Sequence, residues 1–278
     1  MTDLSGLPPL REVIARHALR AKKGFGQHFL LDLNLTRRIA RGAGDLAGVT
    51  VIEVGPGPGG LTRALVESDA AAVVAVERDP RFLPALGELA AASGGRLRIV
   101  EADALEVDFL ALAPAPRAVV ANLPYNVGTP LLIGWLKHSE AFRSLTLMFQ
   151  KEVVDRVVAQ PGSKAYGRLS VMSQWRANCR ALFDVPRQAF TPPPNVVSAV
   201  VHLVPRAMGP DEPLFAVMER VVAAAFGQRR KMLRASLRAI RPDPEPVIVA
   251  AGLDPTARAE EIPVAGFRRL ALAFGENS

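Results

Sequence analysis

The sequence predicts an α/β fold, with helices on both faces of a mainly parallel sheet, followed by a small helical domain. Between Val49 and Leu147, short runs rich in β-branched residues alternate with helical stretches, the pattern of strands joined by crossover helices. The runs are too apolar to alternate polar with apolar residues, as expected of strands buried on both faces. After Pro213 the pattern is helical without strands.

The expected elements follow in chain order. The strands are residues 49–54, 72–77, 97–101, 118–122 and 145–150, with helices that include 61–68 and 82–92. The alternating run 196–204 is a further strand that could close the sheet. Residues 205–213 are rich in proline, glycine and charge and read as a linker, and helical patterns cover 214–240 and 257–274. We therefore expect a larger α/β domain over 1–205 and a small helical domain over 206–278.

Composition limits the class of protein. A chain of 278 residues with 49% hydrophobic side chains can bury a full core. Cys179 is the only cysteine, which excludes disulfide frameworks and zinc sites built from cysteine pairs, and we expect no metal. The chain has no run of apolar residues long enough for a membrane span or an export signal. We expect a protein of the reducing cytoplasm.

The net charge is +7, from 34 basic and 27 acidic side chains, so phosphate is the expected counter-charge. An arginine-rich genomic composition could also produce this excess. One basic cluster lies before Asp45 and includes Lys22 and Lys23. The other comprises Arg229, Arg230, Lys231, Arg234 and Arg238. Helical spacing would put Arg230, Arg234 and Arg238 on one face, which predicts a basic helix docked on a core; a solvated face without a partner is equally compatible.

The first motif is a strand that runs into a glycine turn, residues 51–61, and then a helix. Glycine lets the backbone approach a ligand closely, so we expect Gly55 and Gly57 to contact a nucleotide-like cofactor. The spacing also satisfies the dinucleotide pattern, but Pro56 and Pro58 remove N–H groups that would hold a pyrophosphate. S-adenosylmethionine has no phosphate and loses nothing by this.

Two acids end the next two strands. Glu77 can accept hydrogen bonds from both hydroxyls of an unphosphorylated ribose. Asp103 can accept from the cofactor's adenine amine, although aspartate is also a common helix cap.

The motif Asn122-Leu123-Pro124-Tyr125 ends the fourth strand. The exocyclic amine of adenine is a poor nucleophile because its lone pair is delocalised into the ring. The Asn122 side-chain oxygen and the Leu123 carbonyl can accept the two amine hydrogens and localise that lone pair, while Tyr125 offers a stacking face. Catalysis would then be mostly positioning and electrostatics, without a strong general base.

With these motifs, the chain resembles the bacterial small-subunit ribosomal RNA adenine dimethyltransferases, the dimethyladenosine transferase family linked to kasugamycin sensitivity. The resemblance rests on residues 22–30, 53–57, 122–126, 150–153, 161–170, 190–194 and 226–231. It implies a Rossmann-like class I methyltransferase sheet. It also implies that His28, Leu30 and Asn122 lie at the cofactor, together with Gly55, Glu77 and Asp103. Phe190 would supply a second aromatic face to the target base. Phe190 could instead be core. Residues 195–197, Asn-Val-Val, depart from the family pattern of Lys followed by Val-Asp.

The resemblance further implies dimethylation of two adjacent adenosines in a hairpin near the 3′ end of small-subunit ribosomal RNA. The partner would be the small-subunit precursor, gripped by both basic clusters through its backbone, and the enzyme would be a monomer. Three alternatives remain. They are a large-subunit adenine methyltransferase of the macrolide-resistance type, a dinucleotide-dependent oxidoreductase, and an assembly factor without activity.

Overall fold

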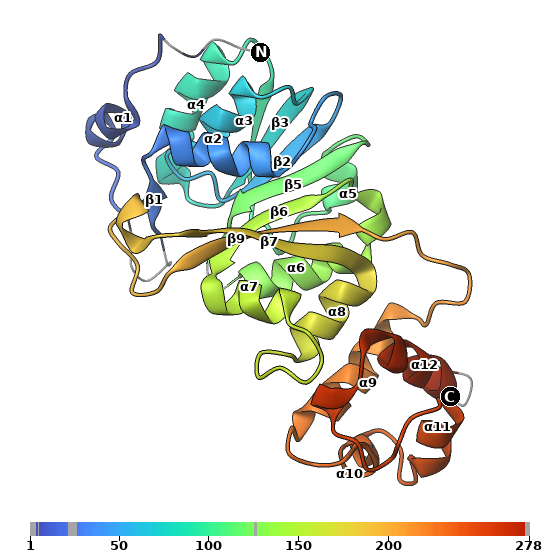
Figure 1. Cartoon of the computed structure of the whole chain (residues 1–278). Helices are drawn as coiled ribbons and strands as arrows, with labels where there is room; N and C mark the ends of the chain where they lie inside the picture. The colour runs from blue at the N-terminus through green and yellow to red at the C-terminus, as the bar shows by residue number, and fades with distance from the viewer. Residues whose placement is uncertain (1–3, 5, 22–26, 125–126, 276–278) are drawn as a thin grey trace. The chain divides into compact units, whose positions relative to one another are not determined.

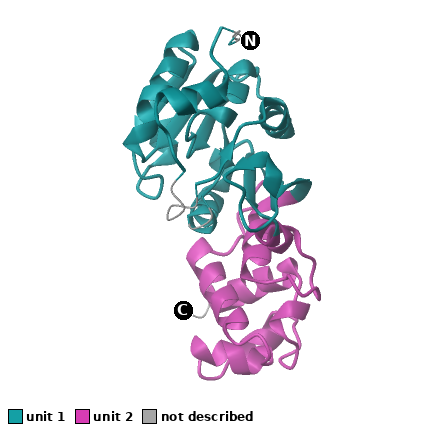
Figure 2. Ribbon diagram, turned by 90° about the vertical axis from the view of Figure 1, so that its left-hand side faces the viewer, with its two compact units in different colours: residues 1–151, 180–204 teal, residues 152–179, 205–278 magenta. Residues whose placement is uncertain are grey.

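The computed structural model describes residues 4, 6–21, 27–124 and 127–275. The predicted site residues Lys22, Lys23 and Tyr125 lie outside these described residues. The chain divides into two compact units, which Figure 2 shows in different colours. The first contains Met1–Lys151 and Arg180–Val204, and the second contains Glu152–Cys179 and Pro205–Ser278. This grouping puts residues 152–179 with the C-terminal helices, whereas the predicted division at residue 205 keeps them in the first domain.

The sheet has the strand order β4-β3-β2-β5-β6-β9-β7. The bounds are β2 Thr50–Val54, β3 Ala72–Glu77, β4 Leu97–Glu101, β5 Arg117–Asn122, β6 Leu145–Gln150, β7 Ala177–Val185 and β9 Ser198–Pro205. The pairs from β4 to β6 are parallel, and β9 pairs antiparallel with β6. The five predicted strands are confirmed. The sixth, β9, does not close the sheet, because β7, which the sequence patterns did not predict, lies beyond it.

Helices cover both faces of this sheet (Figure 1). One face carries α2 (Leu33–Gly42) and α3 (Gly60–Glu67), whose apolar residues share a core cluster with Val51, Val73 and Met148. Successive strand residues point to opposite faces. Phe149, next to Met148, packs against Gly128 of α6 (Gly128–Lys137), so α6 covers the other face. Phe109 of α5 (Phe109–Leu112) meets Trp135 of α6 edge-to-face.

The N-terminal arm runs to the glycine turn. It begins with α1 (Leu10–Arg16), whose Val13 shares an apolar cluster with residues of α4 (Leu83–Ala92), while Nε2 of His17 lies 2.8 Å from the Glu88 carboxylate. The arm ends in β1 (Phe29–Leu30), which pairs antiparallel with β8 (Phe190–Thr191). This pairing places Leu30 opposite Phe190.

The second unit is helical. Its elements are most of α7 (Lys151–Val158), then α8 (Arg168–Arg176), α9 (Phe215–Gly227), α10 (Leu233–Ser236), α11 (Glu245–Ala250) and α12 (Val264–Gly275). Tyr166 and Phe267 both contact the ring of Phe226 inside it. No helix among the described residues has both the length and the apolar character needed to cross a membrane.

The predicted basic helix through Arg230, Arg234 and Arg238 is wrong. Helix α9 ends at Gly227, residues 228–231 form a turn and a bend, Met232 makes an isolated β-bridge with Arg258, and α10 starts only at Leu233. The backbone N–H groups of Leu233 and Arg234 donate to the carbonyls of Ala257 and Pro255, at 2.8 and 3.0 Å. In a continuous helix these N–H groups would donate to carbonyls four residues earlier in the chain. Here the carbonyls of residues 255 and 257 take their place.

Candidate functional site

The turn after β2 depends on glycine. Gly55, Gly57 and Gly59 have φ values of 70°, 55° and 91°, a region that strongly favours glycine. Gly60, which starts α3, packs so closely on the carbonyl oxygen of Leu30 that a Cβ there would collide with it. The turn is therefore fixed between the sheet and the β1 segment of the arm.

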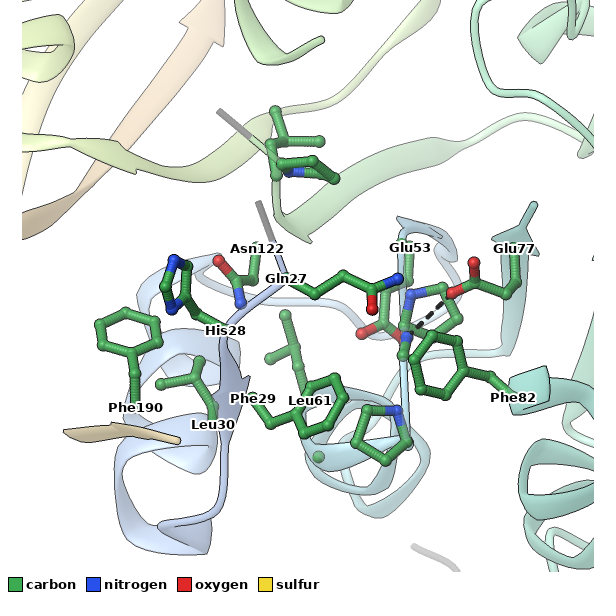
Figure 3. Close-up of a pocket in the computed structure, with 17 residues that line it drawn as sticks. Gln27, His28, Phe29, Leu30, Glu53, Leu61, Glu77, Phe82, Asn122 and Phe190 are labelled. Atoms are coloured by element: carbon green, nitrogen blue, oxygen red, sulfur yellow. Dashed lines mark hydrogen bonds between the residues drawn. The ribbon is translucent and has the colours of Figure 1, made fainter. Parts of the chain in front are cut away.

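Glu77, the last residue of β3, connects the glycine turn to that strand by hydrogen bonds. Its Oε2 accepts from the Gly57 N–H at 3.0 Å, drawn dashed in Figure 3, and its Oε1 accepts from the Asp79 N–H at 2.8 Å. Burial raises the pKa of Glu77, and these backbone hydrogen bonds oppose the rise. The Gly57 N–H is consequently already in use, and Pro56 and Pro58 have none.

Two adjoining cavities open at the carboxyl ends of the strands and share Gln27, Gly55, Glu77 and Pro124. The first is lined by the predicted residues His28, Leu30, Gly55, Gly57, Glu77, Asn122, Leu123 and Phe190. The second, of ≈ 310 Å³, is lined by Glu77 and Asp103. Figure 3 shows Asn122 and His28 on one side of the first cavity, Glu53 and Glu77 on the other, and Gln27 between them. The structure thus brings the described members of the predicted cofactor and adenine sites together.

Asn122 ends β5 at the mouth of the first cavity. Within the described part of the chain its side-chain amide makes no hydrogen bond, so it does not brace its own turn. Leu123 is almost fully buried and its N–H donates to the Met148 carbonyl at 3.4 Å. The amide of Asn122 is available to an incoming ligand.

His28 and Phe190 form another wall. Nδ1 of His28 lies 2.7 Å from the Pro192 carbonyl, which can only accept, so the proton of that bond belongs to Nδ1. The rings of His28 and Phe190 meet edge-to-face with centroids 6.3 Å apart. Phe190 is 3% exposed and belongs to the core cluster while also lining the cavity, so the two expectations for this residue are not exclusive.

Asp103 is already engaged at both carboxylate oxygens. Oδ1 accepts from the Leu105 N–H at 3.0 Å, and Oδ2 accepts from the Arg78 guanidinium at 2.7 Å. Asp103 and Arg78 both line the second cavity. A ligand amine would have to share an oxygen of Asp103 with Arg78, a residue that the sequence patterns did not single out.

Glu53 is the main residue of the first cavity that sequence reasoning missed. It is 1% exposed, and its Oε2 has no hydrogen-bond partner among the described residues. Burial raises the pKa of Glu53 to about 8. A buried acceptor without a partner is costly, which favours a cationic or hydrogen-bond-donating ligand beside it. The sequence feature that could have identified Glu53 is a charged residue within an otherwise apolar strand, two residues before Gly55.

A family model described as ribosomal RNA adenine dimethylase matches residues 18–274. The chain belongs to this family. A relative from Rhodospirillum rubrum named ribosomal RNA small subunit methyltransferase A is 62% identical, over 98% of this chain and 94% of the relative. A relative of the same name from a Jannaschia species is 60% identical, over 98% and 95%. The predicted resemblance is thereby confirmed.

Solved structures share this fold. A dimethyladenosine transferase from Plasmodium falciparum superposes with a TM-score of 0.74 at 24% identity, covering 90% of this chain and 98% of that one. The 23S rRNA methyltransferase ErmE superposes with a TM-score of 0.67 at 28% identity, covering 88% and 98%. The predicted Rossmann-like class I methyltransferase fold is confirmed.

The predicted RNA-binding residues of this dimethylase lie in the second unit, apart from Lys22 and Lys23. Arg229 pairs with Glu260 at 2.9 Å, and Arg234 lies 3.7 Å from Glu245. Arg230 and Lys231 are exposed and have no ion pair among the described residues. The four cations therefore differ in how available they are to phosphate. The described residues also include no group of acidic, histidine or cysteine side chains that could hold a metal ion.

Proposed function

We propose that this ribosomal RNA adenine dimethylase transfers methyl groups from S-adenosylmethionine to the N6 amines of two adjacent adenosines. The target would be a hairpin near the 3′ end of small-subunit ribosomal RNA. The observation that supports this best is the first cavity, where Asn122 and Leu123 lie beside the glycine turn and Glu77. We propose that the enzyme acts as a cytoplasmic monomer on a small-subunit precursor.

The cavities fit a cationic cofactor without phosphate. Glu53 offers a buried carboxyl oxygen without a partner, and Glu77 offers a carboxylate held in place by two N–H groups. The turn has little to give a pyrophosphate, because Glu77 occupies the Gly57 N–H and the two prolines have none. When bound, S-adenosylmethionine would supply an electrophilic methyl group. Glu53, Glu77 and Asp103 would hold its cationic amino-acid part, ribose and adenine amine, respectively.

The residues of the first cavity would activate the target amine by position. The Asn122 side-chain oxygen and the Leu123 carbonyl accept its two hydrogens, so the nitrogen lone pair is drawn out of conjugation with the purine ring. Phe190, and Tyr125 outside the described residues, would hold the purine between aromatic faces. The methylated amine becomes acidic and loses a proton to solvent, so these residues need not include a strong base.

Substitution of Asn122 tests this role. We expect Asn122→Ala to abolish methylation while leaving small-subunit binding largely intact, because the basic clusters, and not this side chain, would hold the RNA backbone. Asn178→Ala, at an exposed position of β7, is the matched control and should retain full turnover. The assay is transfer of radiolabel from S-adenosylmethionine to unmethylated small subunits. Unchanged turnover in Asn122→Ala would refute the assignment.

This transfer assay and two binding measurements separate the alternatives. Label that enters only naked large-subunit RNA would reverse the substrate assignment. Saturable binding of NAD without binding of S-adenosylmethionine would overturn the cofactor. Subunit binding by the wild-type protein without any transfer would favour an assembly factor that lacks activity.

A further inference from the structure

A loop over residues 160–167 is fastened to the segment 258–262, both in the second unit. The Gly162 N–H donates to the Glu260 carbonyl at 2.7 Å. The Tyr166 hydroxyl, which is buried, donates to the Ile262 carbonyl at 2.9 Å. These bonds hold both ends of the loop but leave its exposed middle, around Lys164, to other contacts.

Arg229 supplies the contact in the middle. Its Nε donates to the Glu260 carboxylate at 2.9 Å, and its second terminal nitrogen donates to the Lys164 carbonyl at 2.6 Å. One guanidinium thus bridges the loop and the 258–262 segment through two different nitrogen atoms. A phosphate would have to compete with a carboxylate for the same group, which makes Arg229 a poor phosphate contact.

Unlike Arg229, the neighbouring cations have no acidic partner among the described residues. Lys164, Arg230 and Lys231 are exposed, and within the described part of the chain their charges have no acidic partner. Arg229 precedes two of them in sequence and contacts the backbone of the third. Three cationic residues without an acidic partner among the described residues are thus either adjacent in sequence to the paired Arg229 or in contact with it through their backbone.

We propose that Arg229 is a positioning residue that, with Glu260, holds the 160–167 loop so that Lys164, Arg230 and Lys231 form one phosphate-binding surface. This inference rests on the proposed function, because it takes RNA phosphate as the ligand. The surface would read backbone position and not sequence, since lysine and arginine on phosphate carry no base information. It adds Lys164, which the sequence patterns did not assign, and changes the role of Arg229.

Removing Glu260 separates this role from a direct contact. Glu260→Ala makes the surface more positive by one charge, so it should leave RNA binding unchanged or tighter if Arg229 contacts phosphate directly. If Arg229 positions the loop, Glu260→Ala should weaken binding about as much as Arg229→Ala, by roughly three- to tenfold. Lys164→Ala should weaken binding and reduce the salt slope by about one.

Two measurements make the test decisive. Binding of the full-length variants to purified small subunits is measured at several salt concentrations, with Glu245→Ala as the control, because it removes an acid from Arg234 without touching the loop. Hydrogen exchange of residues 160–167 is measured on the protein alone. We expect faster exchange in Glu260→Ala and Arg229→Ala, near-normal exchange in Arg230→Ala, and recovery in Glu260→Gln, whose amide oxygen still accepts from Arg229.

The inference is overturned if Glu260→Ala binds as tightly as the wild type while Arg229→Ala does not, or if the loop exchanges normally in both. Failure of the wild-type protein to bind small subunits would instead contradict the proposed function. The exchange experiment would still report whether Arg229 holds the loop.

Discussion

Three carboxyl groups surround the cavities, and each is held differently. Glu77 accepts from two backbone N–H groups, Asp103 pairs with Arg78, and Glu53 has a buried oxygen without a partner among the described residues. All three lie at or within two residues of the carboxyl ends of the parallel strands β2, β3 and β4, so they share one edge of the sheet. Glu53 alone relies on a ligand to satisfy that oxygen, so its ionisation should be the most sensitive to cofactor binding.

The raised pKa of Glu53 makes stability depend on pH. Below its ordinary pKa of 4.5 the carboxyl is protonated in both the folded and the unfolded chain. As pH rises towards about 8, the unfolded chain ionises Glu53 while the folded protein keeps it protonated, and the free energy of unfolding falls. The cofactor-free wild type should therefore lose about 3 kcal/mol relative to Glu53→Gln between about pH 5 and 8.

Urea unfolding of both proteins at several pH values measures this difference. The amide of Glu53→Gln does not titrate, so every other ionisable group cancels in the comparison. Parallel stability curves for the two proteins would show that Glu53 ionises normally in the folded state.

At the scale of elements, the site depends on the close approach of β1 to the start of α3. Gly60 lies against the Leu30 carbonyl, and Leu30 is paired with Phe190 through β1 and β8. A displacement of the backbone at Gly60 would therefore change the positions of His28, Leu30 and Phe190 together.

We expect Gly60→Ala to destabilise the protein by about 1–3 kcal/mol, because the added Cβ forces the backbone of Leu30 to move. Binding of S-adenosylmethionine should weaken as well. Gly87→Ala is the matched control, since a Cβ there meets nothing within 4 Å in the middle of α4. That change should stabilise the protein by about 0.5–1 kcal/mol through helix propensity. Thermal unfolding and calorimetric binding compare the two; equal behaviour would contradict the packing argument.

The sequence patterns predicted the buried elements better than the exposed ones. Strands β2, β3, β5 and β6 were evident because their residues are mostly apolar and buried. Strand β7 carries Asn178, Cys179 and Arg180 and is only half-buried, so neither of its faces gave a periodic signal. The basic segment 228–238 has helical spacing, but its backbone bonds go to residues 255 and 257, a tertiary preference that local periodicity does not contain.

For the candidate site, the sequence predicts which residues come together but not which partners they have. That Gly55, Glu77 and Asn122 meet was predictable, because the carboxyl ends of neighbouring parallel strands share one edge. That Glu53 lacks a partner was not, since this depends on what buries it. The pairing of Arg229 with Glu260, 31 residues away, likewise requires the folded chain. The local sequence thus predicts where the chemical groups of the site lie. Tertiary packing determines which of them already have a hydrogen-bond or ion-pair partner.

At the scale of the whole molecule, the carboxyl groups of the cavities and the exposed cations without acidic partners lie on different parts of the chain. Glu53, Glu77 and Asp103 line the cavities, whereas the excess that gives a net charge of +7 includes exposed cations such as Arg230 and Lys231. A small cation suits the former and a polyanion the latter, so the two ligands would be attracted to different surfaces of one chain.

This separation predicts two different responses to salt. RNA binding releases condensed counterions, so affinity for small subunits should fall steeply between about 50 and 200 mM salt, with a slope set by the number of phosphates contacted. Affinity for S-adenosylmethionine should change little over the same range, because charges in a partly buried cavity are weakly screened. Filter binding of small subunits and calorimetry of the cofactor, on one preparation, measure both. Subunit affinity that does not change with salt would contradict phosphate recognition. Protein cations that bind RNA phosphates displace counterions, and that displacement depends on the salt concentration.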